Sequence, residues 1–202
     1  MEGNPCNTIL LHRMMPHVST LGPYSRLCLW TQGCPRRCEG CITPEAQPLS
    51  GGYRVEFGEI ESMLLRYPEQ EGLTISGGEP FLQATALCHL IDRLRNKKDV
   101  GVIIYSGYTL NELQQSFAPK DSLSLLARTD LLIDGPYVQS LDDNGALRGS
   151  SNQQALLLTN RYKGEISRYG AGKKRETELR YSENGFCIIG VPKKSFPKEQ
   201  ML

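Results

Sequence analysis

The hydrophobic positions of this chain follow two periods, one typical of buried strands and one typical of amphipathic helices. Short apolar runs bounded by turn residues predict strands at residues 9–11, 26–32, 73–76, 100–105 and 130–134. Apolar residues spaced three and four apart predict helices at residues 57–67, 85–95, 110–117 and 121–127. Strands that alternate with helices indicate βαβ units, so we expect an α/β fold with a parallel sheet.

The pattern changes toward the C-terminus. Residues 155–158 are apolar, residues 161–180 are polar with many charges and glycines, and residues 186–191 are apolar again. A run of charges is usually a solvated face of a protein. We therefore divide the chain into a core domain of residues 1–154 and a C-terminal appendage of residues 155–202, which we expect to form a hairpin across or beside the sheet.

Charge and hydropathy exclude several classes of partner. The chain has 23 basic and 22 acidic residues and a formal net charge of +1, so no global field attracts nucleic acid or an anionic membrane. No apolar run approaches the roughly 18 residues that a membrane span needs, and the N-terminus lacks the pattern of an export signal. We expect a cytoplasmic protein with no nucleic-acid or membrane partner.

Three of the 7 cysteines crowd into a loop that follows the first long predicted strand, namely Cys34, Cys38 and Cys41. An odd number of cysteines without an export signal argues against a disulfide framework. Three thiolates can hold three irons of a [4Fe-4S] cluster and leave the fourth iron open. A structural zinc site needs a fourth ligand, and no second cysteine pair is present, so zinc with a distant ligand stays as the alternative.

Polar and turn-forming residues follow the other predicted strands as well. Because the carboxyl ends of parallel strands meet at one edge of a sheet, we expect these turns to converge with the cysteine loop. Gly77 and Gly78 would let the backbone approach a ligand closely, and the carboxylate of Glu79 suits an ammonium group. Ser106 also follows a strand. For Asp134, which precedes a Gly-Pro pair, a turn role and a ligand role are equally supported.

Two of these motifs together resemble those of the radical S-adenosylmethionine (SAM) superfamily. The Cys-x3-Cys-x2-Cys spacing is similar to its cluster motif, and the Gly-Gly-Glu-Pro turn at residues 77–80 is similar to the motif that holds the methionyl amine of SAM. The predicted strands fall short of eight, and the chain is shorter than the roughly 250 residues of a full (β/α)8 barrel. We therefore expect a parallel-sheet, incomplete TIM-type barrel of the radical SAM kind, with a short C-terminal appendage.

Narrower matches resemble one branch of the glycyl-radical enzyme activases, the anaerobic ribonucleotide reductase activating enzymes. The similarity covers residues 8–154, and its signposts occur in order at Gly22-Pro23 with Arg26, at Gly33-Cys34, and at residues 38–41, 105–109, 133–137 and 148–153. Gly40, before the third cysteine of the loop, also agrees with this group. The chain departs from the group at Tyr24, where a glycine is usual, and in its long appendage.

The resemblance implies a reaction and the partners for it. A [4Fe-4S] cluster reduced by one electron binds SAM at its open iron and cleaves the sulfonium bond, which gives methionine and a 5′-deoxyadenosyl radical. That radical takes a hydrogen atom from the α-carbon of one glycine in a partner protein. The implied partners are a glycyl-radical enzyme and a one-electron donor such as flavodoxin or ferredoxin.

The same resemblance implies roles for individual residues. The iron ligands would be the thiolates of Cys34, Cys38 and Cys41. The residues implied to contact SAM are Gly40, Cys41 and Ile42 at the adenine, Gly77, Gly78 and Glu79 at the methionyl end, and Ser106 and Asp134 around the ribose or carboxylate.

Two other functions stay open on the sequence alone. One is a radical SAM enzyme that acts on a free metabolite or a small peptide, for which we would expect a closed polar pocket rather than an open groove. The other is a non-catalytic zinc- or cluster-binding interaction module, which would not bind SAM. The sequence offers no Ser-His-Asp arrangement or carboxylate pair suited to hydrolysis.

Overall fold

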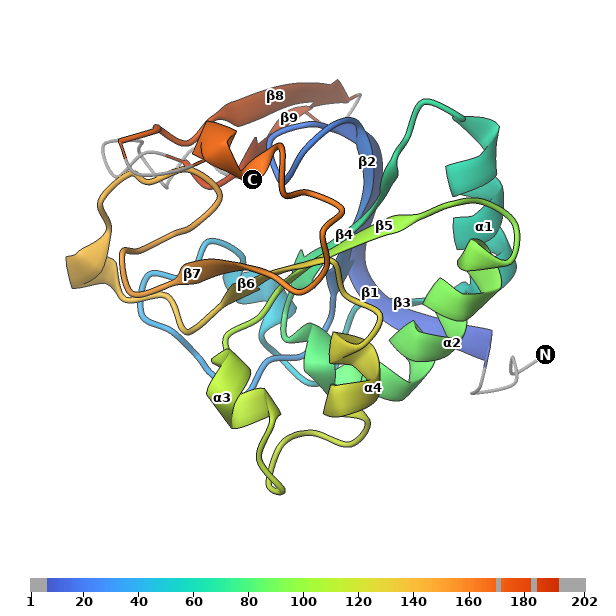
Figure 1. The fold of residues 1–202 in the computed structure, drawn as a ribbon, viewed down its shortest axis with the longest axis horizontal. Coiled ribbons are helices and arrows are strands. Elements are labelled where there is room, and N and C mark those ends of the chain that lie inside the picture. The colour runs from blue at the N-terminus through green and yellow to red at the C-terminus, as the bar shows by residue number, and fades with distance from the viewer. Residues whose placement is uncertain (1–6, 170–171, 183–184, 193–202) are drawn as a thin grey trace.

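The computed structural model describes residues 7–169, 172–182 and 185–192, which Figure 1 shows as a ribbon. Within these ranges, one sheet has the strand order β3-β1-β2-β4-β5-β6-β7. Its strands are β1 (Thr8–Val18), β2 (Arg26–Thr31), β3 (Tyr53–Glu56), β4 (Gly72–Gly77), β5 (Gly101–Tyr105), β6 (Leu131–Asp134) and β7 (Gln154–Leu157). The described helices are α1 (Phe57–Arg66), α2 (Ala84–Arg95), α3 (Leu110–Leu113) and α4 (Ser122–Leu126), with 3-10 turns η2 (Pro44–Ala46), η3 (Pro80–Gln83), η4 (Gln139–Leu141) and η5 (Ile166–Tyr169). None of these helices has the length and hydrophobicity of a membrane-spanning segment.

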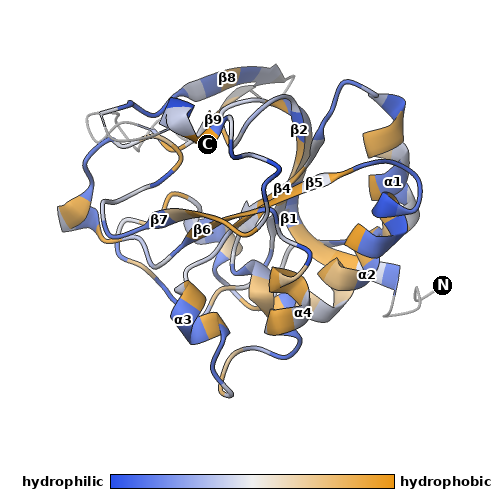
Figure 2. Ribbon diagram, viewed as in Figure 1, coloured by the Kyte–Doolittle hydropathy of each residue, from blue (hydrophilic) through white to orange (hydrophobic). Residues whose placement is uncertain are grey.

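The centre of the sheet is parallel, as the sequence predicts. Strands β2, β4, β5 and β6 run in the same direction, with Leu27 opposite Leu73 and Leu73 opposite Val102. These strands are largely buried along their length, and Figure 2 shows β4, β5 and β6 as hydrophobic. Burial on both faces explains why their sequences are continuous apolar runs rather than alternating ones.

Antiparallel strands at both edges complete the sheet. β1 pairs antiparallel with β2 and β3, and β7 pairs antiparallel with β6. β1 is longer than the strand predicted at residues 9–11, because register shifts after Leu11 and after Met15 let its more polar second half bend along β2. The strand order ends at β3 on one side and at β7 on the other, so the barrel is open. The expected incomplete barrel is confirmed.

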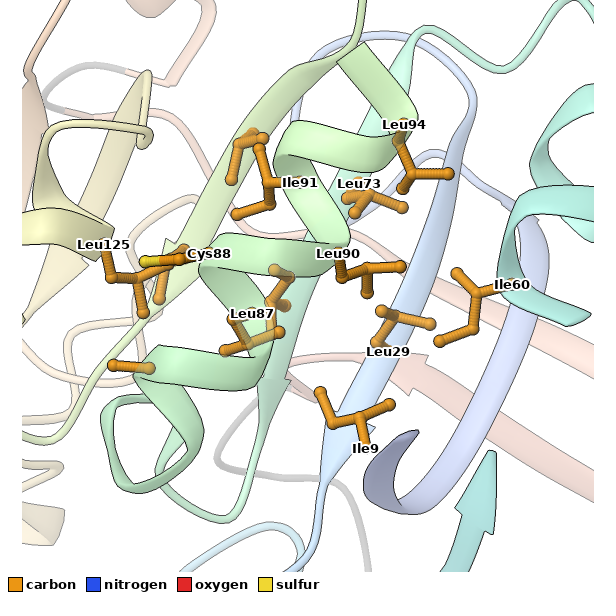
Figure 3. Close-up of a cluster of buried hydrophobic side chains, with 14 of the residues drawn as sticks. Ile9, Leu29, Ile60, Leu73, Leu87, Cys88, Leu90, Ile91, Leu94 and Leu125 are labelled. Atoms are coloured by element: carbon orange, nitrogen blue, oxygen red, sulfur yellow. The ribbon is translucent and has the colours of Figure 1, made fainter. Parts of the chain in front are cut away.

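Helices α1, α2 and α4 pack on one face of the sheet and enclose the main hydrophobic core. The helical spacing of Leu87, Leu90 and Leu94 turns these side chains of α2 toward Leu29 and Leu73 on the strands (Figure 3). All five side chains are fully or almost fully buried. The opposite, inner face of the sheet is left for the C-terminal part of the chain.

Helix α3 is shorter than the sequence pattern predicts. It ends at Leu113 rather than at residue 117, and Phe117, the last apolar residue of the pattern, is 74% exposed. A short helix without a buried apolar stripe gains too little from packing to extend further. Its N-terminus is nevertheless fixed by a capping box between Thr109 and Glu112.

The described part of the appendage folds onto the inner face of the sheet. Tyr162 packs against Ile103 and Ile133 there, and Ile189 packs against Cys28. Strands β8 (Thr177–Ser182) and β9 (Gly185–Gly190) form an antiparallel hairpin, as expected, whereas residues 193–202 lie outside the described residues. β7 keeps the chain in the main sheet just past residue 154, and the division into a core and an appendage stays a prediction.

Candidate active site

The cysteine loop begins where β2 ends and is held by a neighbouring segment of its own chain. The backbone N–H groups of Gly33 and Cys34 donate to the carbonyl oxygens of Ala46 and Gln47, at 2.8 and 2.9 Å. The side chain of Gln32 donates to two further carbonyl groups of the same segment. These bonds fix the base of the loop, so the thiols start from a defined position at the carboxyl edge of the sheet.

The three cysteines of the loop line a single pocket of about 660 Å³. Cys34, Cys38 and Cys41 are free thiols of intermediate exposure, and burial raises the pKa of the Cys34 thiol. Over the described ranges, no three His, Cys, Asp or Glu side chains form a group that could hold a single metal ion. Cys6 lies outside those ranges.

The glycine pair after β4 packs directly against the base of the cysteine loop. The N–H groups of Gly78 and Glu79 donate to the carbonyl oxygens of Thr31 and Gly33, at 2.7 and 2.8 Å. A Cβ atom at Gly78 would lie 2.3 Å from the Gly33 oxygen, and one at Gly77, whose φ is +99°, would lie 2.5 Å from the Thr31 nitrogen. Both glycines line the pocket. The close contact between the strand ends is by itself enough to require glycine at both positions.

The carboxylate of Glu79 lies behind the pocket wall. It is 0% exposed and accepts hydrogen bonds from Ser106 Oγ at 2.9 Å, from the Gly107 N–H at 2.8 Å and from the Phe81 N–H at 3.1 Å. Burial raises its pKa to about 7 despite these three donors. Its bonds to Ser106 and Gly107 join the ends of β4 and β5. Because Ser106 and Gly107 line the pocket, Glu79 sets the position of that part of the pocket wall.

We expect Glu79→Gln to remove a pH dependence from the stability of the cofactor-free protein. The folded-state pKa of about 7 lies above the ordinary value of 4.5, so the folded state keeps the proton that the unfolded state loses. Stability therefore falls as pH rises from 4.5 to 7, by about 3 kcal/mol, and is level above that window. Urea unfolding at a series of pH values checks this. Glu79→Gln should lack the slope and the exposed control Glu59→Gln should keep it; an equal slope in both variants would contradict the assignment.

Asp134 also serves the backbone. Its carboxylate accepts from the Leu110 N–H at 2.7 Å and from the Gln154 N–H at 3.3 Å, and so ties β6 to the start of α3 and to β7. The neighbouring Gly135 lines the pocket. These contacts favour the turn role over the ligand role for Asp134.

The sequence-predicted residues thus separate into two groups. One group lines the pocket together and comprises Cys34, Cys38, Gly40, Cys41, Ile42, Gly77, Gly78 and Ser106. The other group, Glu79 and Asp134, lies behind it and bonds to the loops that form it.

Several residues of the site were missed in the sequence. Arg36 extends from the cysteine loop to Glu112 of α3 at 2.6 Å and stacks on the ring of Tyr108, 4.2 Å from its centroid. Trp30 and Tyr105 line the pocket from the inner face of the sheet. Side chains two residues apart share a face of a strand, so Trp30 lies on the face of Cys28 and Tyr105 on the face of Ile103, but the continuous apolar runs of β2 and β5 do not distinguish the two faces. No signal in the sequence indicated Arg36 or the pocket residues of the appendage, which are Arg175, Ile188, Ile189, Gly190, Val191 and Pro192.

An open α/β sheet with a three-thiol loop at its carboxyl edge is the arrangement that the sequence resemblance predicts for a radical SAM iron–sulfur protein. The family described as "4Fe-4S single cluster domain" matches residues 20–156. An anaerobic ribonucleoside-triphosphate reductase-activating protein of Vibrio cholerae is 33% identical over 150 residues, which are 70% of this chain and 94% of that protein. The chain therefore belongs to the 4Fe-4S single-cluster family, in the branch of these radical SAM activating proteins.

Other relatives extend the same branch. The protein of the same name from Escherichia coli is 28% identical over 152 residues, 70% of this chain and 94% of its own length. A pyruvate formate-lyase-activating enzyme of Clostridium pasteurianum is 32% identical over 133 residues, 61% of this chain and 50% of that enzyme.

The cofactors of this family are a [4Fe-4S] cluster and SAM. The donor set in the pocket fits them. Three partly exposed thiols are the soft ligands that an iron–sulfur cluster requires, and they share the pocket with glycine backbone and with the hydroxyl-bearing Ser106.

Proposed function

We propose that this chain is a radical SAM activating enzyme that forms a glycyl radical on a partner enzyme of the anaerobic ribonucleotide reductase type. The observation that carries the proposal is the gathering of three free thiols and the Gly77–Gly78 backbone around one pocket at the strand ends. The reductase-activating relatives supply the kind of partner.

In this proposal Cys34, Cys38 and Cys41 hold the cluster as thiolates. The chemistry that the cluster and SAM would supply there, given one electron, is a 5′-deoxyadenosyl radical that would take a hydrogen atom from the glycine α-carbon, with methionine and 5′-deoxyadenosine as products. The chain itself binds and orients these groups. It also limits water at the pocket, which the inner-face side chains Trp30 and Tyr105 help to line.

The remaining pocket residues position SAM. The backbone of residues 40–42 contacts the adenine, and Gly77 and Gly78 contact the methionyl end. Ser106 faces the ribose or carboxylate region. We assign Glu79 and Asp134 as positioning residues, because their carboxylates hold the loops that carry this wall rather than the wall itself.

The electron comes from a one-electron donor such as flavodoxin or ferredoxin. We place the reaction in the cytoplasm, where thiols are kept reduced. The cysteines of the described ranges are free, which agrees with that compartment.

Anaerobic reconstitution with iron and sulfide, followed by SAM, dithionite and the anaerobic reductase of the same organism, tests the proposal. We expect 5′-deoxyadenosine and an electron paramagnetic resonance doublet of a glycyl radical on the reductase, with no doublet when SAM is omitted. Nucleoside without the doublet would instead favour a radical SAM enzyme for a metabolite or a small peptide. Zinc without sulfide, and no nucleoside, would favour a binding module.

A further inference from the structure

The C-terminal appendage contributes directly to the pocket that contains the thiols. Arg175 and the segment from Ile188 to Pro192 line this pocket together with Cys34, Cys38 and Cys41. The match to the single-cluster family ends at residue 156, so these wall residues lie beyond it. The appendage is therefore an addition to the site and not only to the surface.

One side of the appendage is anchored beyond β6. The side chain of Arg175 is buried and forms an ion pair with Asp142, and it donates to the carbonyl oxygens of Gly149 at 3.1 Å and Pro192 at 3.0 Å. Close to Arg175, the backbone N–H of Ala146 also donates to the carbonyl oxygen of Lys173. Because Pro192 belongs to the pocket segment, one guanidinium fixes that segment to the 142–149 loop.

The other side is anchored at the turn between β1 and β2. The carboxylate of Glu178 on β8 accepts from the N–H groups of Ser19 and Thr20, at 2.6 and 2.9 Å, and these bonds help to hold its pKa below the ordinary value against the effect of burial. Arg180 donates to the carbonyl oxygen of His17. Figure 1 shows the β8–β9 hairpin beside this part of the chain. The appendage thus spans the open side of the sheet, from the β6–β7 loop to the β1–β2 turn.

The pocket-lining residues of the appendage, Arg175 and residues 188–192, form a wall opposite the inner face of the sheet. Ile189 packs into a cluster with Val18, Leu21 and Cys28, and Trp30 packs against the same cluster. The thiols and the glycine pair, in contrast, stand at the strand ends. The strand ends are where we place the cofactors, so the inner side is the space that remains for the radical acceptor.

We propose that the appendage is the acceptor-side wall of the reaction pocket and admits only a narrow, extended main-chain segment without bulky side chains. This inference rests on the proposed function. A pocket of about 660 Å³ is of the size that encloses one small-molecule ligand, so bound SAM occupies most of it. A glycine-bearing loop of a protein fits the remaining passage, whereas a folded surface or a large side chain does not.

Substitution of Val191, a pocket residue of the wall, tests the inference. Val191→Phe adds bulk to the passage, and Leu179→Phe adds the same ring to β8 at a position that is 70% exposed. We expect Val191→Phe to lower the glycyl-radical yield on the reductase about tenfold, because the added ring narrows the passage that the glycine-bearing segment must enter. SAM binding in equilibrium dialysis and acceptor-free 5′-deoxyadenosine should stay within about twofold, and Leu179→Phe should leave all three readouts unchanged.

Each contrary result has its own meaning. An unchanged radical yield in Val191→Phe would overturn the acceptor wall. An equal loss of SAM binding and radical yield would also overturn it, because the segment would then border the cofactor. If the wild-type protein forms no nucleoside, the proposed function itself fails.

The docking of the wall has a separate readout that needs neither cluster nor SAM. Trp30 is the only tryptophan of the chain and packs against the cluster that contains Ile189. Arg175→Ala removes the anchor, so acrylamide quenching of Trp30 fluorescence should increase by about twofold, while Arg168→Ala, at a 71% exposed arginine of the same appendage, should not change it. Equal quenching in wild type and Arg175→Ala would overturn the anchoring role of Arg175 and with it the fixed wall.

Discussion

Cys38→Ala should abolish cluster assembly and reduce 5′-deoxyadenosine formation to background, a loss of at least about three orders of magnitude. Cys38 is the central member of the thiol trio and lines the same pocket as Cys34 and Cys41. With only two thiols left, the chain cannot hold three corners of a cubane, and an alanine supplies no replacement ligand. Iron and sulfide analysis after anaerobic reconstitution, together with the nucleoside assay, measures the effect.

Cysteines outside the trio provide matched controls for this experiment. Cys88 is a buried core residue of α2, and Cys187 lies on β9 beside the cluster around Ile189. Cys88→Ala and Cys187→Ala should keep the iron and sulfide content of the wild-type protein. Full cluster content in Cys38→Ala, or its loss in Cys88→Ala alone, would contradict the assignment of the ligands.

The centre of the fold could be predicted because burial on both faces leaves a clear pattern. Each central strand is a continuous apolar run, and α2 repeats its apolar residues at helical spacing against them. The edge strands have no such pattern. β1 is half-buried over most of its length and interrupted by two register shifts, and β3 has a single buried residue, Val55. Pairing with a neighbour, rather than burial of an apolar face, makes these segments strands.

The pocket could be predicted in part for a similar reason. Turns that follow parallel strands must converge, so the cysteine loop, Gly78 and Ser106 were placed together correctly. The direction of a carboxylate at a strand end is not encoded in that way. Glu79 and Asp134 could face a ligand or the N–H groups of a neighbouring loop, and the structure gives them the N–H groups. Only three-dimensional packing decides between the two.

The appendage shows the limit of reading charge from sequence. Its charged stretch looked like a solvated face, yet Arg175 is buried at the pocket and Glu178 caps the β1–β2 turn. Tyr162, near the start of that stretch, is also fully buried. Partners that are not neighbours in sequence account for this burial, such as Asp142 for Arg175, Ser19 for Glu178 and Arg26 for Tyr162, and such contacts leave no local pattern.

Arg26 lies at the opposite end of the parallel strands and joins them to the appendage. Its guanidinium is fully buried, pairs with Glu71 at 2.5 Å and donates to the carbonyl oxygens of Leu73 and Gly101, at 2.6 and 3.0 Å. It also donates to the Tyr162 hydroxyl at 3.0 Å, which in turn donates to Glu71 at 2.6 Å. Arg26 is one of the residues on which the family resemblance rests. Its contacts show that it stabilises the fold rather than binding a ligand in the pocket.

Arg26→Met should destabilise the protein by about 3–5 kcal/mol, because it removes the buried donor of the Leu73 and Gly101 carbonyl groups and the buried cationic partner of Glu71, which keeps only Tyr162 and Arg161. The matched control is Arg93→Met, whose more exposed pair with Glu61 should be worth less than about 1 kcal/mol. Urea unfolding followed by Trp30 fluorescence measures both.

Although burial acts in the other direction, Arg26 and its neighbours hold the pKa of Glu71 below its ordinary value of 4.5. The stability that this pair contributes is therefore present above that value and is lost as pH falls through the lowered folded-state pKa, so the difference between wild type and Arg26→Met should shrink in acid. A loss no larger than that of Arg93→Met, or one that grows in acid, would show that Arg26 does not hold the strands and the appendage together.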